Sequence, residues 1–189
     1  MRSWVFGMMF LGACTAAYAG FPDPYIGVEL GAVRSSLATP QGDASPQTAR
    51  AAGVTLGTRL SPTWAIEADV MGRVERRPAY QLPPALSGAT KASAMAVRSV
   101  PLSGDLSLLL KAGLGWVHSE ARYLLPYVKC APDRPDCAQA VARQYRWGPA
   151  VGTALQWDQR PWSVRIQYDW LPSGHDAMTV GVGVFRHFH

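Results

Sequence analysis

The stretch Trp162-Ser-Val-Arg-Ile-Gln-Tyr-Asp-Trp170 alternates between large apolar residues at even positions and polar residues at odd positions. A strict period of two over this length predicts a β-strand with one apolar and one polar face. Aromatic residues stand at both ends of the apolar face, and Arg165 and Asp169 lie on the polar face. In a soluble sandwich the apolar face would be core, whereas in a membrane barrel it would face lipid, with its aromatic residues at the two interfaces. This strand alone does not separate the two architectures.

The same alternation recurs along the chain and predicts eight strands. We expect them at residues 25–35, 51–60, 64–76, 91–100, 106–121, 143–157, 162–170 and 177–188. The connections between them alternate between long polar segments and tight turns, which is typical of an up-and-down barrel in the bacterial outer membrane. The sequence therefore predicts an all-β fold, an eight-stranded antiparallel up-and-down transmembrane β-barrel with both termini on the side of the short turns.

The faces opposite the apolar ones are rich in small residues and carry charges of both signs. The predicted lumen charge network comprises Glu29, Arg59, Glu67, Asp69, Arg98, Lys111, Arg165 and Asp169. A soluble core does not accommodate so many charges, whereas a closed lumen can pair them. A structural network is one interpretation and an ion path the other, although eight strands leave no continuous aqueous channel in general.

Tryptophans cluster near the ends of the apolar strand faces and predict two lipid-interface belts. Those near tight turns are Trp64, Trp157 and Trp162, and those towards the long connections are Trp116, Trp147 and Trp170.

The first 19 residues differ from the rest of the chain. Arg2 precedes an apolar run over 4–13, and Ala17-Tyr-Ala19 is a small-x-small cleavage site. This pattern is typical of a secretory signal peptide, and the apolar run is too short to span a bilayer as a helix. We expect 1–19 to be a signal peptide and 20–189 to be the barrel domain.

The cysteines fit an exported protein. Cys130 and Cys137 bracket a turn-rich spacer, which predicts a local disulfide and not a zinc site, since no further ligands lie nearby. The segment before Cys14 loosely resembles a lipoprotein box, so lipidation of Cys14 is the alternative to its removal with the signal peptide.

Composition and spacing argue against several other functions. The formal net charge is +5, but charged residues make up only 16% of the chain and there are three lysines and no basic run, so nucleic-acid binding is not expected. The triplet His118-Ser119-Glu120 is the tempting catalytic motif, yet in a strand Ser119 points away from the face that His118 and Glu120 share. The other histidines form no metal-ligand spacing. We expect no enzyme activity, no metal and no cofactor.

Several segments resemble the OmpA-like/OmpX-like family of small outer-membrane β-barrels, and the resemblance covers essentially all of 20–189. They are Trp64–Asp69, Pro101–Leu108 with Lys111–Trp116, Gly148–Leu155 and Thr179–Phe188. The resemblance implies a barrel-only member, located in the outer membrane after export through the periplasm, with Phe188 as the assembly signal read by the barrel assembly machinery. The chain departs from the family pattern in two ways: Arg186 stands where the family has an aromatic residue, and His189 follows Phe188.

These observations predict a structural or surface-interaction, adhesin-like role through the extracellular loops. The expected partners are outer-membrane lipid and lipopolysaccharide, the barrel assembly machinery, and a host or surface protein that contacts the loops, with the barrel itself a monomer. A lipid A-modifying outer-membrane enzyme and a narrow pore are the alternatives.

Overall fold

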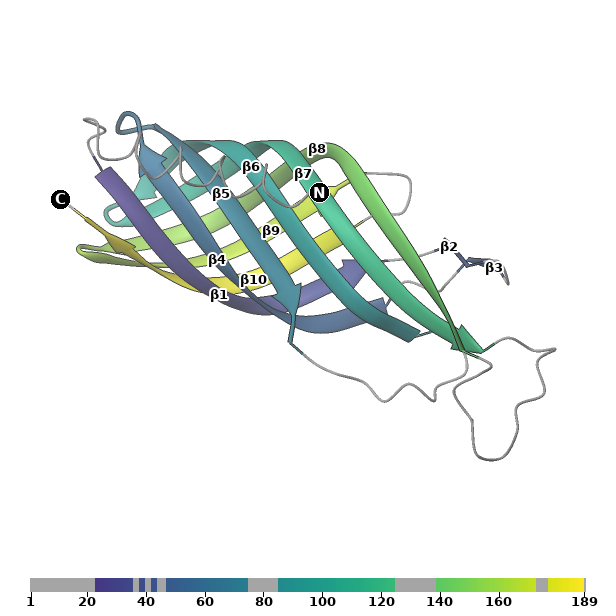
Figure 1. The fold of residues 1–189 in the computed structure, drawn as a ribbon. Helices are drawn as coiled ribbons and strands as arrows, with labels where there is room; N and C mark the ends of the chain where they lie inside the picture. Colours follow the sequence, from purple (N-terminus) through teal and green to yellow (C-terminus); the bar gives the residue numbers. More distant parts are fainter. Residues whose placement is uncertain are drawn as a thin grey trace.

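The structure is a computed structural model that describes residues 23–35, 38–39, 42–43, 47–74, 85–124, 139–172 and 177–188. Eight long strands form one closed antiparallel barrel in the order β1-β10-β9-β8-β7-β6-β5-β4 (Figure 1). They are β1 (Asp23–Ser35), β4 (Gln47–Arg59), β5 (Trp64–Arg73), β6 (Ala85–Ser103), β7 (Leu106–Leu124), β8 (Gln139–Gln159), β9 (Trp162–Leu171) and β10 (Ala177–His187). A separate pair is formed by β2 (Ala38–Thr39) and β3 (Gly42–Asp43). Within the described ranges, no helix is long and apolar enough to cross a membrane.

The predicted eight-stranded barrel is confirmed, and its strand order is that of an up-and-down meander closed by β1 and β10. The predicted signal peptide and the predicted Cys130–Cys137 disulfide lie outside the described residues. The main difference in strand length is at β6 and β8, which start at Ala85 and Gln139, earlier than the alternation indicated. The first residues of β6 are small and polar and carry no periodic signal, but they pair with β7.

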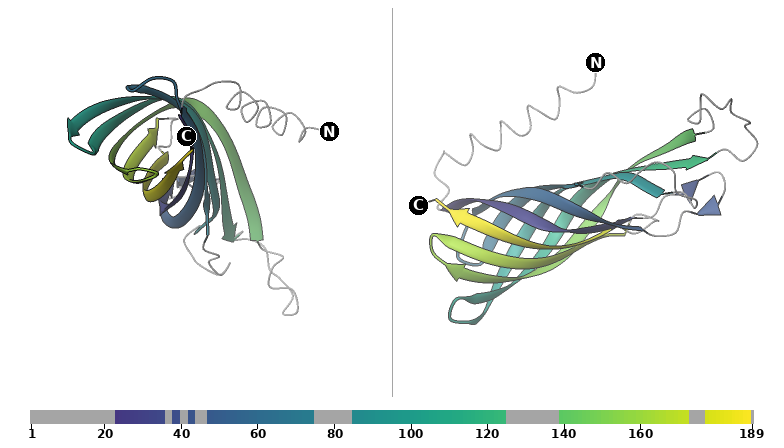
Figure 2. Two further views of the ribbon diagram at one scale, coloured as in Figure 1. Left: turned by 90° about the vertical axis from the view of Figure 1, so that its left-hand side faces the viewer. Right: turned by 90° about the horizontal axis from the view of Figure 1, so that it is seen from below.

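Three tight turns lie at one end of the barrel, which we call the short-turn end. At the β4–β5 turn, the Ser61 hydroxyl accepts hydrogen bonds from the backbone N–H groups of Thr63 (3.3 Å) and Trp64 (3.1 Å). The β6–β7 turn contains Gly104 at φ 43°, a conformation that glycine adopts without steric cost. The start of β1 and the end of β10 lie at the same end, where Phe188 N–H donates to the Pro24 carbonyl (2.9 Å). The opposite end is called the long-loop end (Figure 2).

The pleat separates an apolar outer surface from a polar interior. Leu30, Leu114 and Ile166 point outward and are 70%, 66% and 57% exposed. Arg165 and Asp169, which have the opposite parity to Ile166 on the same strand, point inward and are 2% and 0% exposed. The alternation in the decisive stretch therefore places charge inside the barrel and hydrocarbon outside it.

Strand β6 faces the opposite way from the prediction. The larger residues Met95 and Val97 were expected outside with Arg98 inside, but Met95 and Val97 are both 2% exposed and Arg98 is exposed on the outer surface. The physical reason is packing: Met95 is paired with Gly113 of β7, and the thioether chain fills interior space beside a residue that has no side chain. The assignment of Arg98 to the lumen was therefore wrong.

Three strands continue past the rim at the long-loop end. Pairing of β7 with β8 continues to Leu124↔Gln139, and β6 pairs with β7 as far as Ala85↔Arg122. By contrast, β8 pairs with β9 only from Val151 onward, so in the part of the chain that the structure describes residues 139–150 have a strand partner on one side alone. We call the extension of β6, β7 and β8 the protruding sheet (Figures 1 and 2).

Candidate functional site: the charged interior, the outer belts and the protruding sheet

The part of the interior towards the long-loop end, called the upper part, is organised by Lys91 on β6. Its Nζ lies 2.6 Å from Asp169 Oδ2 and 3.4 Å from Asp69 Oδ2, and it donates to the Thr179 hydroxyl at 3.4 Å. Ser93, two residues along the same face, donates to the carboxylate of Asp69. All of these side chains are buried, so each carboxylate depends on its partners inside the protein for compensation of its charge.

The middle of the interior is organised by Lys111 on β7. Its Nζ lies 3.0 Å from Glu67 Oε2 and 2.8 Å from Gln167 Oε1. The amide nitrogen of Gln167 donates in turn to Glu29 at 2.6 Å. Glu29 also accepts a hydrogen bond from the Thr55 hydroxyl at 2.5 Å. The predicted lumen residues Glu29 on β1, Glu67 on β5 and Lys111 on β7 are thus brought together, with Gln167 on β9 as the link between Lys111 and Glu29.

The lower part is closed by Arg165 on β9. One terminal nitrogen lies 2.6 Å from Glu67 Oε1, while Nε and the other terminal nitrogen donate to Gln156 Oε1 at 3.0 and 2.7 Å. The Tyr25 hydroxyl donates to the same Glu67 oxygen at 2.7 Å. The guanidinium also lies 4.0 Å from the centroid of the Phe185 ring, so both its edge and its face have partners.

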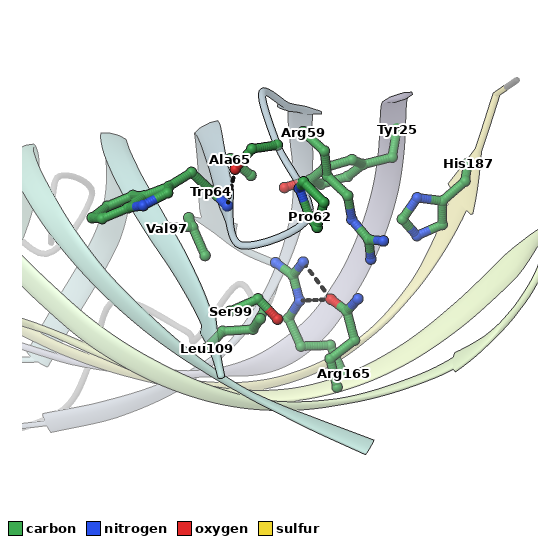
Figure 3. A pocket seen from close by; sticks show the side chains of 12 residues that line it. Tyr25, Arg59, Pro62, Trp64, Ala65, Val97, Ser99, Leu109, Arg165 and His187 are labelled. Atoms are coloured by element: carbon green, nitrogen blue, oxygen red, sulfur yellow. Dashed lines mark hydrogen bonds between the residues drawn. The ribbon is translucent and has the colours of Figure 1, made fainter. Parts of the chain in front are cut away.

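Arg59 belongs to a different cluster at the mouth of the short-turn end. It pairs with Asp158 at 3.1 Å and Asp23 at 3.7 Å, and its side chain is 23% exposed. The His187 ring lies 3.5 Å from Asp23 on the same rim. A small pocket opens here, and Figure 3 shows Arg59 and His187 along it with Arg165 across from them. Because Arg165 and Gln156 line its inner side, the pocket is a vestibule that ends at the charged network.

Apolar clusters also line the interior, towards both ends of the barrel. The cluster near the short-turn end contains Tyr25, Ala65, Val97, Leu109, Ala154 and Phe185. Two clusters towards the long-loop end contain Val33, Ala51, Met71 and Ala89, and Met95, Val117, Ala150, Leu171 and Ala177. Met71 and Val117 of these clusters are the cross-strand partners of Lys91, so apolar and charged side chains alternate in the interior and pack it along its length.

Sequence analysis missed Lys91, the most connected cation of the upper interior. Lys91 and Ser93 share the parity of Met95 and Val97 on β6, whereas Arg98 has the opposite parity. The polar residues at positions 91 and 93 could have shown that the odd-numbered residues of this strand face the lumen. The prediction that Arg98 faces the lumen excluded Lys91 from it, because only one of the two sets of alternating residues can face the lumen.

The six predicted belt tryptophans all project from the outer surface. Trp64, Trp157 and Trp162 lie at strand ends next to the tight turns and are 47%, 52% and 48% exposed. Towards the long-loop end, Trp116 and Trp147 are a cross-strand pair, with ring centroids 6.3 Å apart. Trp170 lies near the upper end of β9.

The catalytic-looking triplet is split as its parity predicts. His118 lies on the outer face, where its ring stacks on Tyr145 at a centroid distance of 4.6 Å and an interplanar angle of 10°. Ser119 points inward and its hydroxyl lies 3.0 Å from that of Ser35. The hydroxyl and the imidazole therefore lie on opposite faces of β7. Among the described residues, no group of three or more His, Cys, Asp or Glu side chains is placed to hold a metal ion.

The C-terminal residues point alternately in and out. Phe185 and His187 are buried inside the barrel, and Arg186 and Phe188 lie outside. The Arg186 guanidinium lies 5.6 Å from the Trp162 ring centroid and 5.5 Å from that of Phe188.

Comparison with known proteins identifies the fold. No protein-family model and no curated protein sequence matches the chain. Among solved structures, it is similar to Neisserial surface protein A (NspA), with a TM-score of 0.60, 11% identity and coverage of 88% of this chain and 99% of that one. OprG of Pseudomonas aeruginosa matches with a TM-score of 0.54, 12% identity and coverage of 89% and 97%.

A third match is Ail, the attachment invasion locus protein of Yersinia pestis, in complex with the heparin analogue sucrose octasulfate. Its TM-score is 0.53 at 12% identity, with coverage of 87% of this chain and 99% of that one. At such identities the likeness is one of architecture. The chain therefore has the fold of the small eight-stranded outer-membrane barrels, as its resemblance to the OmpA-like/OmpX-like family predicted.

Proposed function

We propose that this protein is an integral β-barrel of the bacterial outer membrane whose long-loop end binds molecules at the cell surface. Support for the membrane location comes from an outer surface that is apolar around the barrel and bordered by tryptophans at both ends. In such barrels the short turns lie in the periplasm and the long connections outside the cell. This orientation turns the protruding sheet towards the exterior.

The observation that carries the interaction role is the edge of β8 at residues 139–150, which no second strand covers among the described residues. Residues 139–150 extend past the rim and, among the described residues, pair with β7 alone. An unpaired edge offers backbone N–H and C=O groups to an extended segment of another protein, a recurrent mode of recognition. Pro149, which lacks an N–H, stands where this edge meets the barrel rim, and a proline is tolerated on an edge strand.

The side chains near this edge add aromatic and basic character. Tyr145 and Trp147 are 60% and 64% exposed. Arg143 is 61% exposed and pairs with Glu120 at 3.2 Å, an exposed pair that a competing anion can replace at small cost. Because Ail was solved with a heparin analogue, immobilised heparin is a suitable first probe, next to arrays of extracellular matrix proteins.

The test removes the tip of the protruding sheet and keeps the barrel. Residues 118–145 are replaced by Asn-Gly, which joins the paired residues Val117 and Arg146 through a two-residue hairpin turn and removes Arg143, Tyr145 and most of the β8 edge. Binding of whole cells to the heparin and matrix surfaces is compared with that of the full chain. The matched control is Gly104→Asn in the turn at the other end of the barrel.

We expect binding by the full chain and by the control, and its loss in the trimmed variant, with heat-modifiable gel mobility showing that all three barrels are folded. Equal binding by the trimmed and full chains would contradict the proposal. Equal binding by cells that lack the protein would contradict it as well.

We further propose that the protein is not an enzyme and does not conduct ions steadily. The separation of Ser119 from His118 supports the first point, because nucleophile and base must be within hydrogen-bond reach. The packed interior supports the second. Mass spectrometry of lipid A from cells with and without the protein tests for modification. Recordings in planar bilayers test for a pore, and large stable openings would overturn the plugged interior.

Two further partners follow from this proposal. Phe188, 44% exposed on the outer surface at the end of the last strand, is placed for recognition by the barrel assembly machinery. Phe188→Ala should therefore reduce the amount of folded barrel in the outer membrane. Outer-membrane lipid and lipopolysaccharide would surround the folded barrel, which we expect to be a monomer.

A further inference from the structure

Two arginines interrupt the apolar outer surface near the short-turn end. Arg98 on β6 is paired across the strands with Trp64 on β5, and Arg186 on β10 is paired with Trp162 on β9. In both cases the tryptophan is the first residue of its strand after a tight turn. Both arginines therefore lie at the level of the lower tryptophan belt.

Each guanidinium carbon lies over a neighbouring aromatic ring. The Cζ atom of Arg98 lies 5.8 Å from the Trp64 ring centroid. The Cζ atom of Arg186 lies 5.6 Å from Trp162 and 5.5 Å from Phe188. Contacts of this kind attract the cation to the ring and use no oxyanion, so the guanidinium N–H groups can still donate to one.

Neither arginine forms an ion pair with a carboxylate in the described part of the chain. This contrasts with Arg165 and Arg59, which pair with Glu67 and with Asp158 and Asp23. An arginine on the lipid-facing surface is strongly unfavourable at mid-membrane and close to neutral near the interfaces. At the interface the available oxyanions are the phosphates of the lipid headgroups, which match the fork of a guanidinium.

We propose that Arg98 with Trp64, and Arg186 with Trp162 and Phe188, form two binding sites for the phosphate of glycerophospholipids in the leaflet at the short-turn end. The inference rests on the proposed membrane location and adds a partner chemistry to named residues. The stacked aromatic ring holds each guanidinium in the plane of the interface, and the N–H edge binds the phosphodiester. Arg186 stands where the family pattern has an aromatic residue, and in this arrangement it binds the lipid phosphate.

The arrangement of the two sites favours lipid over a protein partner. Along the closed sheet, β7 and β8 separate them on one side and β4 and β1 on the other, so they lie on opposite sides of the barrel. A single acidic protein would cover one side, whereas the same chemistry on both sides fits a partner that surrounds the barrel. The outer surface between them is apolar, as Leu155 on β8 and Ile26 on β1 illustrate.

The test measures contact between guanidinium nitrogen and lipid phosphorus. The full chain is labelled with ¹⁵N in its arginine side chains and reconstituted in vesicles of phosphatidylethanolamine and phosphatidylglycerol. Dephasing of each ¹⁵N signal by ³¹P is then recorded by solid-state NMR. Arg98→Gln and Arg186→Gln identify the two signals, and Arg143→Gln, which removes an exposed arginine of the protruding sheet, is the matched control.

We expect the dephased signals of Arg98 and Arg186 to disappear one by one in their own variants and to remain in the Arg143→Gln protein. The interior Arg165 should show no dephasing in any sample, and none should be seen for any arginine in a phosphorus-free detergent. A barrel that floats with the vesicles but shows no dephasing at Arg98 and Arg186 overturns this inference and leaves the membrane location standing. A protein that does not float with the vesicles overturns both.

Discussion

Replacing Lys91 by methionine should be among the most damaging single changes in the barrel interior. The substitution keeps an unbranched chain of similar length but removes the ammonium that lies 2.6 Å from Asp169 and 3.4 Å from Asp69. Lys111 remains the nearest other cation to Asp169, at 4.0 Å. Removal of one partner from a buried ion pair leaves an uncompensated charge and costs about 3–5 kcal/mol. We expect a loss of this size in the free energy of unfolding.

The matched substitution is Arg98→Met on the same strand. Arg98 is exposed on the outer surface and stacks on Trp64, a contact worth about 0.5–1 kcal/mol at an exposed site. Loss of this contact is offset by the removal of a charge from a lipid-facing position near the interface, which is worth about 0–1 kcal/mol. The free energy of unfolding should therefore change little.

Both changes can be measured by reversible urea unfolding of the barrel in phospholipid vesicles, followed by the fluorescence of the outer tryptophans. Adding Asp169→Asn to Lys91→Met should recover part of the loss, because it removes a carboxylate that the first change left unpaired. A larger loss for Arg98→Met than for Lys91→Met would refute the orientation of β6. Additive effects of Lys91→Met and Asp169→Asn would refute the ion pair.

Three further predictions test the outer surface, the strand packing and the long loop. Ile166→Arg places a charge in the middle of the lipid-facing surface and should cost about 2–4 kcal/mol in the same unfolding assay, while Ile166→Leu should be silent; equal stability of the two would contradict the orientation of β9. Gly113→Ala should lower the unfolding midpoint, because its Cβ would approach a backbone Cα of β6 to 2.7 Å, whereas Gly72→Ala, whose Cβ meets nothing closer than 3.9 Å, should behave as the unmodified chain. Peptide mapping without reduction should yield a Cys130–Cys137 cross-link, and alkylation of both thiols in the untreated protein would exclude it.

Strict alternation made most of the fold predictable from the sequence. In β9 the larger residues are all apolar and the polar residues all have the other parity, so one assignment satisfies both faces. Register follows from the same pattern, since a shift by one residue would turn Arg165 towards lipid and Ile166 into the charged layer. The identity of the outer face then placed six of the eight predicted lumen charges with no further information: Glu29, Glu67, Asp69, Lys111, Arg165 and Asp169.

The pattern was insufficient where both faces of a strand are apolar or small. On β6, Ala92, Ala94 and Ala96 alternate with Ser93, Met95 and Val97, and neither set is clearly lipid-facing by size. What decides the phase is the space left by residues on neighbouring strands, such as Gly113 opposite Met95. That information is in the three-dimensional register and not in the local sequence, so Lys91 was missed and Arg98 was misplaced.

The order of contacts along the barrel axis indicates that the buried charges stabilise the barrel and do not form an ion path. An ion that entered from the short-turn end would first meet the vestibule at Arg59 and then the contacts of Arg165 with Glu67 and Gln156. It would have to separate Arg165 from Glu67. These groups already have their ion-pair and hydrogen-bond partners inside the protein, and the attraction between them is strong where water is excluded. Further towards the long-loop end, Val117 and Leu171 belong to an apolar cluster. A path would need both barriers to open together, whereas a rigid support for the protruding sheet needs both to stay closed.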